Sequence, residues 1–297
     1  TGIVLSVPLC ILLIFLVPPV QPYVDWASGI VIAGVVAVLV LPSPSARVST
    51  GVFLVSGILG LFAFRYAYLS QSPLGTGAIL MPLLSGLFGI SVLLFSGKGA
   101  IPPQQFTGIS LEDRGIARGT LLGSVAGVVV GWLPGLSNAT ANGVLASVVD
   151  CGRDRREYIL ATSAANTTNA LVGLAAFYAV ERTRNGVVSA LSALEVPPLH
   201  ILLVSASLAA LLAYVVTVAC AGLARSLEGI DRTRLAAAVI TFVTFVSFLT
   251  TGPFGLLVLA LATAVGCVPR LLAVPQVFCM GAVMLPVILF SFGFSIA

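Results

Sequence analysis

Residues 198–224 read PLHILLVSASLAALLAYVVTVACAGLA and contain no Asp, Glu, Lys or Arg. A helix needs about 20 predominantly apolar residues to cross the hydrocarbon core of a bilayer, and this stretch is long enough. The rest of the chain has the same character, because 59% of its 297 residues are hydrophobic and only 8% are charged. Soluble proteins carry about 25% charged residues, which give their helices a solvated face. The sequence therefore predicts an all-α, polytopic protein of the cell membrane, surrounded by the lipid bilayer.

Other apolar stretches lie along the chain, and together they predict about nine spanning helices. They cover residues 2–18, 28–41, 50–69, 78–96, 119–133, 137–149, 157–180, 234–250, 254–268 and 271–295. The pair 119–133 and 137–149 is different, because each stretch is too short to cross comfortably and Pro134-Gly135 separates them. This pair is either one broken helix that crosses the membrane or a re-entrant helical hairpin that enters and leaves on one side.

The distribution of basic residues favours the hairpin, because cytoplasmic loops carry an excess of Lys and Arg. With a hairpin, eleven basic residues fall on one side of the membrane and two on the other, whereas a crossing helix gives six against seven. The eleven are Arg47, Lys98, Arg114, Arg118, Arg153, Arg155, Arg156, Arg225, Arg232, Arg234 and Arg270, and the two are Arg182 and Arg184. The hairpin topology places loops 97–118, 150–156 and 225–233 in the cytoplasm and loop 181–197 outside.

The domain organisation that follows is a single transmembrane domain over 1–297. Within it we expect scaffold spans at 1–96, a transport unit at 119–180 made of the hairpin and a polar helix, and C-terminal spans at 198–297. The chain starts at Thr1 in a segment that is already span-like, without a basic n-region or an A-x-A signal. We therefore expect it to be the remainder of something longer.

The first candidate site is the polar segment that follows the Pro134-Gly135 break. Proline removes a backbone donor and glycine relaxes the backbone, so helix 119–133 should end here, and Ser137 or Asn138 is a good N-cap for the next helix. A helix that starts at membrane depth directs N–H groups and the positive end of its dipole into the protein, which suits a carboxylate or a phosphate. The predicted substrate-binding residues here are Pro134, Gly135, Ser137, Asn138, Thr140 and Asn142.

The second candidate site is a run of hydroxyl and amide side chains inside the apolar stretch 157–180. Thr162, Asn166 and Asn169 are four and three residues apart and so share one helical face. Their neutral oxygens suit Na⁺, or they can hydrogen-bond an anion without fixing a charge in the membrane. The predicted substrate-binding residues are Ser163, Asn166, Thr167 and Asn169, and a Na⁺ ion would bind near Thr162, Asn166 and Asn169.

Both segments have a purely structural alternative, since small residues also allow close contact between membrane helices. That alternative explains the Ser, Thr and Ala residues better than the four asparagines, because amides in a membrane need partners. Catalytic chemistry has little support. The only histidine, His200, has no HExxH setting, Ser137 has no evident base, and the chain contains no P-loop. No basic run with interleaved aromatics indicates nucleic-acid binding.

In these motifs the chain resembles the large membrane subunit of the tripartite tricarboxylate transporters, especially its archaeal branch. The matching features are the Pro134-Gly135 break with its polar continuation, the Ser163–Asn169 tract, and the segments Met81–Ile90 and Ile101–Gln105. Together they cover roughly residues 78–195. The resemblance implies an ion-driven importer of small carboxylates, served by an extracytoplasmic binding protein and a small membrane subunit.

The same resemblance implies an internal repeat in which each half has its own Pro-Gly loop. Only one such loop is found here, and the segments before residue 78 contain no equivalent. We therefore expect the first repeat to be absent from this chain or to have diverged. Archaeal members can also work without the partner subunits.

The function that we predict is secondary, ion-coupled transport of small organic anions, of the di- or tricarboxylate class. Na⁺ or H⁺ is the expected coupling ion, and no other cofactor is expected. Two alternatives stay open: a polyprenyl- or lipid-phosphate translocase that uses the same helix terminus, and a membrane scaffold that transports nothing. A homodimer is also left open.

Overall fold

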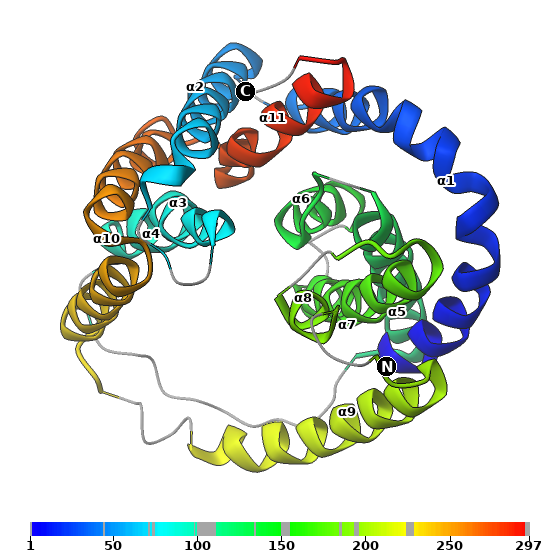
Figure 1. Ribbon diagram of the computed structural model, residues 1–297. Coiled ribbons are helices and arrows are strands. Elements are labelled where there is room, and N and C mark those ends of the chain that lie inside the picture. Colours follow the sequence, from blue (N-terminus) through cyan, green and yellow to red (C-terminus); the bar gives the residue numbers. More distant parts are fainter. Residues whose placement is uncertain are drawn as a thin grey trace. The chain divides into compact units, whose positions relative to one another are not determined.

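The computed structural model describes residues 2–43, 45–70, 72, 75–97, 99, 111–133, 135–149, 155–183, 186–192, 196–223 and 229–294. Regular structure in these ranges is helical, which confirms the predicted all-α, polytopic architecture (Figure 1). Six helices of the described residues are long and apolar enough to cross a membrane. The longer elements are α1 (Gly2–Val40), α2 (Ala46–Arg65), α5 (Asp113–Trp132), α6 (Asn138–Val148), α7 (Arg155–Val180), α9 (Leu199–Ala221), α10 (Arg232–Leu271) and α11 (Gly281–Ser291).

Several predicted boundaries are corrected by these helices. The predicted spans 2–18 and 28–41 are joined in α1, which continues through Pro18, Pro19 and Pro22. The predicted spans 234–250 and 254–268 are joined in α10, with a break inside it at Gly252. Helix α5 has 20 residues, so the expectation that this helix is too short to cross was wrong. Its charged first turns, which we had assigned to loop 97–118, are helical as well.

The other predicted loops also differ in part. Residues 155–156 begin α7, and residues 232–233 begin α10 rather than ending a loop. The predicted outer loop 181–197 contains a short helix, α8 (Gly186–Ser192). Residues 101–110, 150–154 and 224–228 lie outside the described residues.

The chain forms two compact units, each made of two stretches of sequence. Unit 1 comprises residues 1–28 and 105–224, and unit 2 comprises residues 29–104 and 225–297. The predicted transport unit 119–180 lies within unit 1, whereas the predicted scaffold 1–96 is divided between the two units.

Unit 1 is organised around the direct contact of α5 with α7. Five glycines recur at every fourth position of α5, and the last four of them form a stripe that faces α7. A Cβ at Gly123 would collide with the carbonyl oxygen of Ala161, and one at Gly127 would lie 2.6 Å from the carbonyl oxygen of Ala165. The backbones can approach this closely only because the stripe carries no side chains. The four residues are Gly119, Gly123, Gly127 and Gly131.

The order of these contacts shows that α5 and α7 run parallel, side by side as Figure 1 shows. The first glycine of the stripe meets Glu157 at the start of α7, and the last meets Val172. An ion pair between Arg118 Nε and Glu157 Oε1, 3.5 Å apart, joins the same two ends. Because Arg118 is largely exposed, this pair adds little stability, and the backbone packing sets the register.

Helix α6 runs back along this pair. Its first residue, Asn138, hydrogen-bonds Asn169 in the middle of α7, whereas the carbonyl oxygen of Asn142 accepts a bond from Tyr158 near the start of α7. Further along α6, Leu145 packs with Ala161 of α7 and Leu122 of α5 in one apolar cluster. Helices α5 and α6 therefore form an antiparallel hairpin, covered by α7.

Unit 2 is held by α2, α10, α11 and the helical segment from η2 to α4 (residues 76–94). Its core contains Leu59, Leu83, Val258 and Phe278. Gln276 links three parts of this core, because its Nε2 lies 2.6 Å from the carbonyl oxygen of Leu87 and 2.9 Å from that of Gly266. Leu87 belongs to a π-helical turn, Ser85–Ile90, whose wider winding shifts carbonyl groups out of the regular helix pattern.

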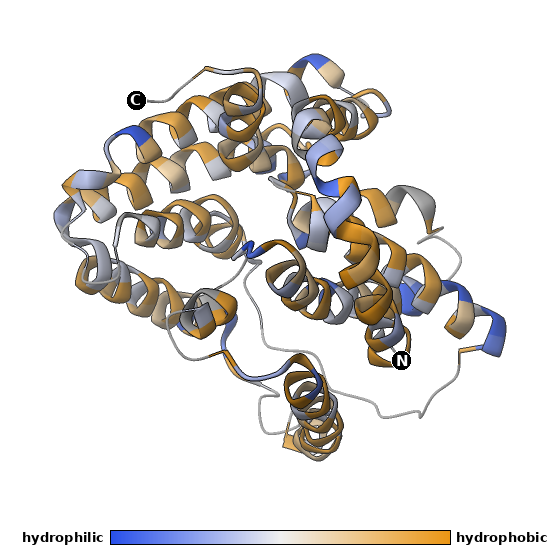
Figure 2. Ribbon diagram, turned by 45° about the vertical axis from the view of Figure 1, so that its right-hand side comes forward, coloured by the Kyte–Doolittle hydropathy of each residue, from blue (hydrophilic) through white to orange (hydrophobic). Residues whose placement is uncertain are grey.

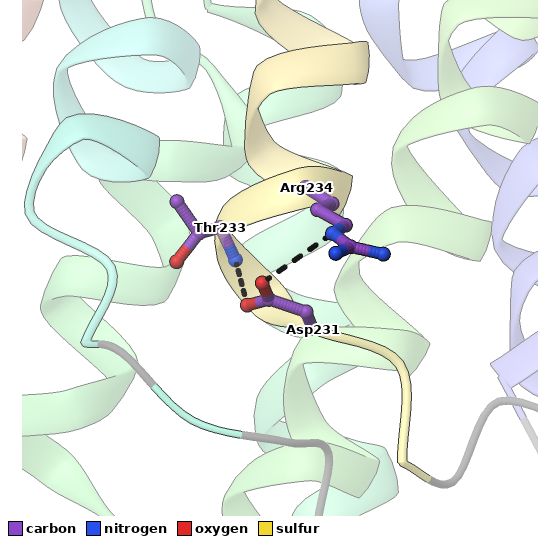
Figure 3. Close-up of polar contacts among 3 residues, drawn as sticks. All are labelled: Asp231, Thr233 and Arg234. Carbon is purple, nitrogen blue, oxygen red and sulfur yellow. Dashed lines mark hydrogen bonds and ion pairs between the residues drawn. The ribbon is translucent and has the colours of Figure 1, made fainter.

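The start of helix α10 and the break inside it are both explained by the residues at those positions. Asp231 caps it: Oδ1 accepts a 2.9 Å hydrogen bond from the Thr233 amide, and Oδ2 lies 3.9 Å from Arg234 Nε (Figure 3). Inside the helix Gly252 adopts φ +67°, which favours glycine, and Pro253 follows it. Because Pro253 has no N–H, the carbonyl of Leu249 loses the donor that a continuous helix would supply.

The helices consist largely of apolar residues, as the orange ribbons of Figure 2 show. Helix α9 is the extreme case, since Leu203 is its only buried residue and the residues around the rest of its circumference include exposed Leu, Val and Tyr side chains. Exposed apolar patches of this size are unfavourable in water. Lipid is therefore the surrounding that this surface fits.

The glycine stripe makes a testable prediction about stability. Gly123→Ala should lower the stability of the purified protein by about 1–3 kcal/mol, because the new methyl group forces α5 away from α7. Gly51→Ala in α2 is the matched control, since nothing lies within 4 Å of a Cβ there, and alanine improves helix propensity. Thermal unfolding in detergent measures both variants. Equal stability of the two would contradict the packing described for α5 and α7.

Candidate functional site

The candidate site lies where the α5–α6 hairpin turns. Helix α5 ends at Trp132 and α6 begins at Asn138. Between them, Gly135 has φ +75°, a left-handed conformation that a residue with a Cβ rarely adopts. Ser137 caps α6, because its Oγ accepts a 3.2 Å hydrogen bond from the Ala139 amide. The predicted helix break and N-cap are thus confirmed, while Pro134 lies outside the described residues.

Two of the predicted amide side chains meet at this turn. Asn169 Nδ2 of α7 donates a 3.0 Å hydrogen bond to Oδ1 of Asn138, the first residue of α6. The Oδ1 atom of Asn169 faces the end of α5, where it would lie 3.2 Å from a Cβ at Gly131. The last glycine of the stripe therefore leaves room for the amide that reaches across to α6.

The turn is also fixed from α1. Trp132 Nε1, at the end of α5, donates a 2.9 Å hydrogen bond to Gln21 Oε1, and Gln21 is buried. An indole and an amide satisfied in this way fix the end of α5 against α1. The two ends of the turn, Trp132 and Asn138, are thus each tied to a different neighbouring helix.

Two further predicted residues place polar atoms in the interior without protein partners. Thr140 is 1% exposed, and its Oγ1 makes no hydrogen bond to the described residues. The Oδ1 atom of Asn142 is buried and likewise has no partner there. A buried polar atom left without a partner costs about 1–3 kcal/mol. These two buried oxygen atoms lie about one turn from the N-terminus of α6, so they are candidates for binding a polar ligand.

The backbone amides of the turn contribute less than the sequence suggested. We expected N–H groups from Ser137 to Thr140 to hold an anion. In the structure the Ala139 amide bonds Ser137 Oγ, and the Thr140 amide bonds the Ser137 carbonyl oxygen at 3.0 Å. The helix dipole is still directed into the turn. Side-chain amide and hydroxyl groups are therefore the main donors that α6 offers.

The polar tract of α7 divides into two groups. Asn169 joins the turn, whereas Ser163 and Asn166 are exposed. The hydroxyls of Thr162 and Thr167 donate to carbonyl oxygens of their own helix, Ile159 and Ser163, at 3.0 Å. The Na⁺ site expected near Thr162, Asn166 and Asn169 stays a prediction.

The sequence reading missed two buried hydroxyl groups that lie close to this region. Ser6 Oγ of α1 and Thr168 Oγ1 of α7 are 2.8 Å apart, and both side chains are fully buried. Thr168 lay inside the predicted tract but off the face that we singled out. Ser6 is an isolated serine in an apolar stretch, and no local pattern distinguishes it from a residue at a helix contact.

A sequence model of the Tripartite tricarboxylate transporter TctA family matches residues 1–281. This chain belongs to that family. The match extends well beyond residues 78–195, on which the resemblance was first noted. Comparisons with curated proteins and with solved structures returned no match.

Membership of the TctA family fixes the general class of activity. The chain is a transport protein of the cell membrane with several spanning helices, and it is not an enzyme. The family name refers to tricarboxylates, which are anionic substrates. The described residues contain no group of three or more His, Cys, Asp or Glu side chains that could hold a metal ion.

The hydrogen bond between Asn138 and Asn169 can be measured by a double-mutant cycle. Asn138→Ala and Asn169→Ala should show a coupling of about 0.5–1.5 kcal/mol in the free energy of unfolding, the usual contribution of a hydrogen bond. Asn138→Ala with Asn166→Ala is the control cycle, and it should be additive because Asn166 is exposed and Asn138 bonds Asn169 instead. Coupling of equal size in both cycles would mean that the pair does not form.

Proposed function

We propose that this chain is the permease of an ion-coupled importer of di- or tricarboxylates, and that it binds the anion at the turn between α5 and α6. One observation carries the proposal. Asn138 and Asn169, from different helices, meet at the N-terminus of α6, beside two buried polar atoms that have no partner among the described residues.

The chemistry of the turn suits a carboxylate. Asn138 uses its Oδ1 to accept from Asn169, so its own Nδ2 group remains available as a donor to a ligand. The hydroxyl of Thr140 is a second donor, and the positive end of the α6 dipole attracts negative charge. The partnerless Oδ1 of Asn142 accepts rather than donates, so it suits a hydroxyl group or a protonated carboxyl of the same ligand.

The short length of α6 supports a position of the proposed anion site inside the membrane. Its 11 residues extend about 16 Å, roughly half of the 30 Å hydrocarbon core. If α6 ends at the membrane surface, as the basic residues that follow it favour, its N-terminus lies near the midplane. The antiparallel course of α5 and α6 is the one that a re-entrant hairpin needs. Discontinuous helices at this depth are a recurring device for substrate sites in transporters.

The remaining parts of the proposal follow from the family. A tripartite system supplies an extracytoplasmic binding protein and a small membrane subunit as partners of the permease. The coupling ion would be Na⁺ or H⁺, because transport against a gradient needs a source of energy and the sequence contains no P-loop for ATP. The proposed site includes Gly135, Ser137, Asn138, Thr140, Asn142 and Asn169.

A thermal-shift screen tests the substrate class. Purified protein is heated with citrate, other di- and tricarboxylates, or phosphorylated lipid headgroups, each in Na⁺ and in K⁺. A ligand that binds only the folded protein stabilises it, by about 2.7 kcal/mol at 100 times its Kd. We expect stabilisation by a carboxylate. Stabilisation by phosphate headgroups alone would instead favour the lipid-phosphate translocase.

Thr140→Val tests the place of binding. The variant removes a hydroxyl that has no protein partner, so the empty protein should be as stable as the wild type or slightly more stable. Its affinity for the carboxylate should fall about tenfold, the equivalent of one hydrogen bond of 1.4 kcal/mol. Thr241→Val is the matched control, because its hydroxyl is exposed and bonds the carbonyl oxygen of Ala237 in its own helix. Unchanged affinity in Thr140→Val would place the anion elsewhere.

A further inference from the structure

A second polar cluster lies in unit 1 where α1, α5 and α7 meet. The register of α1 against α5 is given by three contacts: Val4 and Thr120 border one cavity, Val128 packs on the cluster that contains Cys10, and Gln21 bonds Trp132. Ser124 lies one turn before Val128 on the same face of α5. Its fully buried side chain therefore faces α1 near Ser6.

Four hydroxyl groups are concentrated in this seam, and all are buried. Ser6, Ser124 and Thr168 are 0% exposed, and Thr120 is 7% exposed. The Oγ atom of Ser6 donates to the Gly2 carbonyl oxygen at 2.6 Å, so the 2.8 Å contact with Thr168 requires Thr168 to be the donor. Both hydroxyl hydrogens are then used, while oxygen lone pairs of Ser6 and Thr168 remain available.

Thr120 and Ser124 behave differently from most helical hydroxyls of this chain. Many hydroxyl groups elsewhere in the described helices donate to the carbonyl oxygen four residues earlier, as at Ser91, Ser207 and Thr263. The Oγ1 of Thr120 and the Oγ of Ser124 make no such bond and have no other partner among the described residues. These two buried oxygens are therefore available to a ligand.

A cavity of about 590 Å³ gives access to this seam. It is lined by Val4, Leu5, Ile116, Ala117 and Leu121, and its polar walls come from Thr120 and Asp113. Asp113 is the acidic residue that begins α5, so the cavity is lined by one carboxylate and one hydroxyl group. A carboxylate among the lining residues favours a cation over an anion in this cavity.

We propose that the α1–α5–α7 seam binds a monovalent cation, Na⁺, through the hydroxyl oxygens of Ser6, Ser124 and Thr168, with entry past Asp113 and Thr120. Small hard cations prefer oxygen ligands, and a set without a carboxylate suits a single positive charge inside the membrane. The inference rests on the proposed function in one respect, since it makes this cation the coupling ion. Thr168 is followed directly by Asn169, so the cation and the anion sites would share the α7 backbone.

The test is the thermal stability of the full chain in detergent at constant ionic strength, without any carboxylate, as NaCl replaces choline chloride. We expect a saturable rise in Tm with Na⁺. Ser124→Ala removes a hydroxyl that has no partner among the described residues, so the variant should fold normally. It should raise the half-saturating Na⁺ concentration at least tenfold. Thr168→Val should do the same. Ser205→Ala in α9 is the control, because that hydroxyl is exposed and bonds its own helix.

Identical Tm values in Na⁺ and choline, or a half-saturating concentration that stays the same in Ser124→Ala, would overturn the cation site. The outcomes separate the two proposals. Stabilisation by citrate in choline without any effect of Na⁺ would refute the cation site alone. Stabilisation by Na⁺ that is lost in Ser124→Ala, without stabilisation by any carboxylate, would support the cation site and refute the anion site.

Discussion

The rest of unit 1 depends on the contact of the α5 and α7 backbones along four glycines. Where a Cβ would collide with the Ala161 carbonyl oxygen, no larger residue fits, so the two helices have one register and a close spacing. Membrane helices gain no hydrophobic free energy by leaving lipid for one another, and close packing takes its place. This spacing is what allows the Asn169 side chain to pass the end of α5 and bond Asn138 of α6.

Both units use this device, although their helices differ. In unit 2 a Cβ at Gly60 would collide with the Ala282 carbonyl oxygen, and one at Gly281 with that of Phe53, which brings α2 and α11 into backbone contact. Polar side chains then occupy the few places where a helix is irregular. In unit 2 the Gln276 side chain donates a hydrogen bond to a carbonyl oxygen of the π-helical turn. In unit 1 the Asn169 side chain donates one to Asn138 at the hairpin turn. Close packing and local irregularity therefore occur together in both units.

Local chemistry made part of this structure predictable. Composition alone gave the membrane class, Pro134-Gly135 gave the end of α5, and Ser137 was foreseen as a cap because capping depends on neighbouring residues. The course of α1 was not predictable, since four prolines within it suggested a break and the helix continues. Contacts between distant segments, such as Ser6 with Thr168, were also not predictable. A single sequence does not indicate which serine faces which helix.

The contrast between α5 and α9 has a consequence for how the gene can change over time. Any base change that replaces a glycine codon of the α5 stripe by that of another amino acid introduces a Cβ, and the stripe has no room for it. Helix α9 makes no such demand, since one Leu, Val or Ala serves its exposed surface as well as another. Among related chains, we expect the residues of α9 to be replaced often by other apolar residues, while the glycines of α5 stay the same.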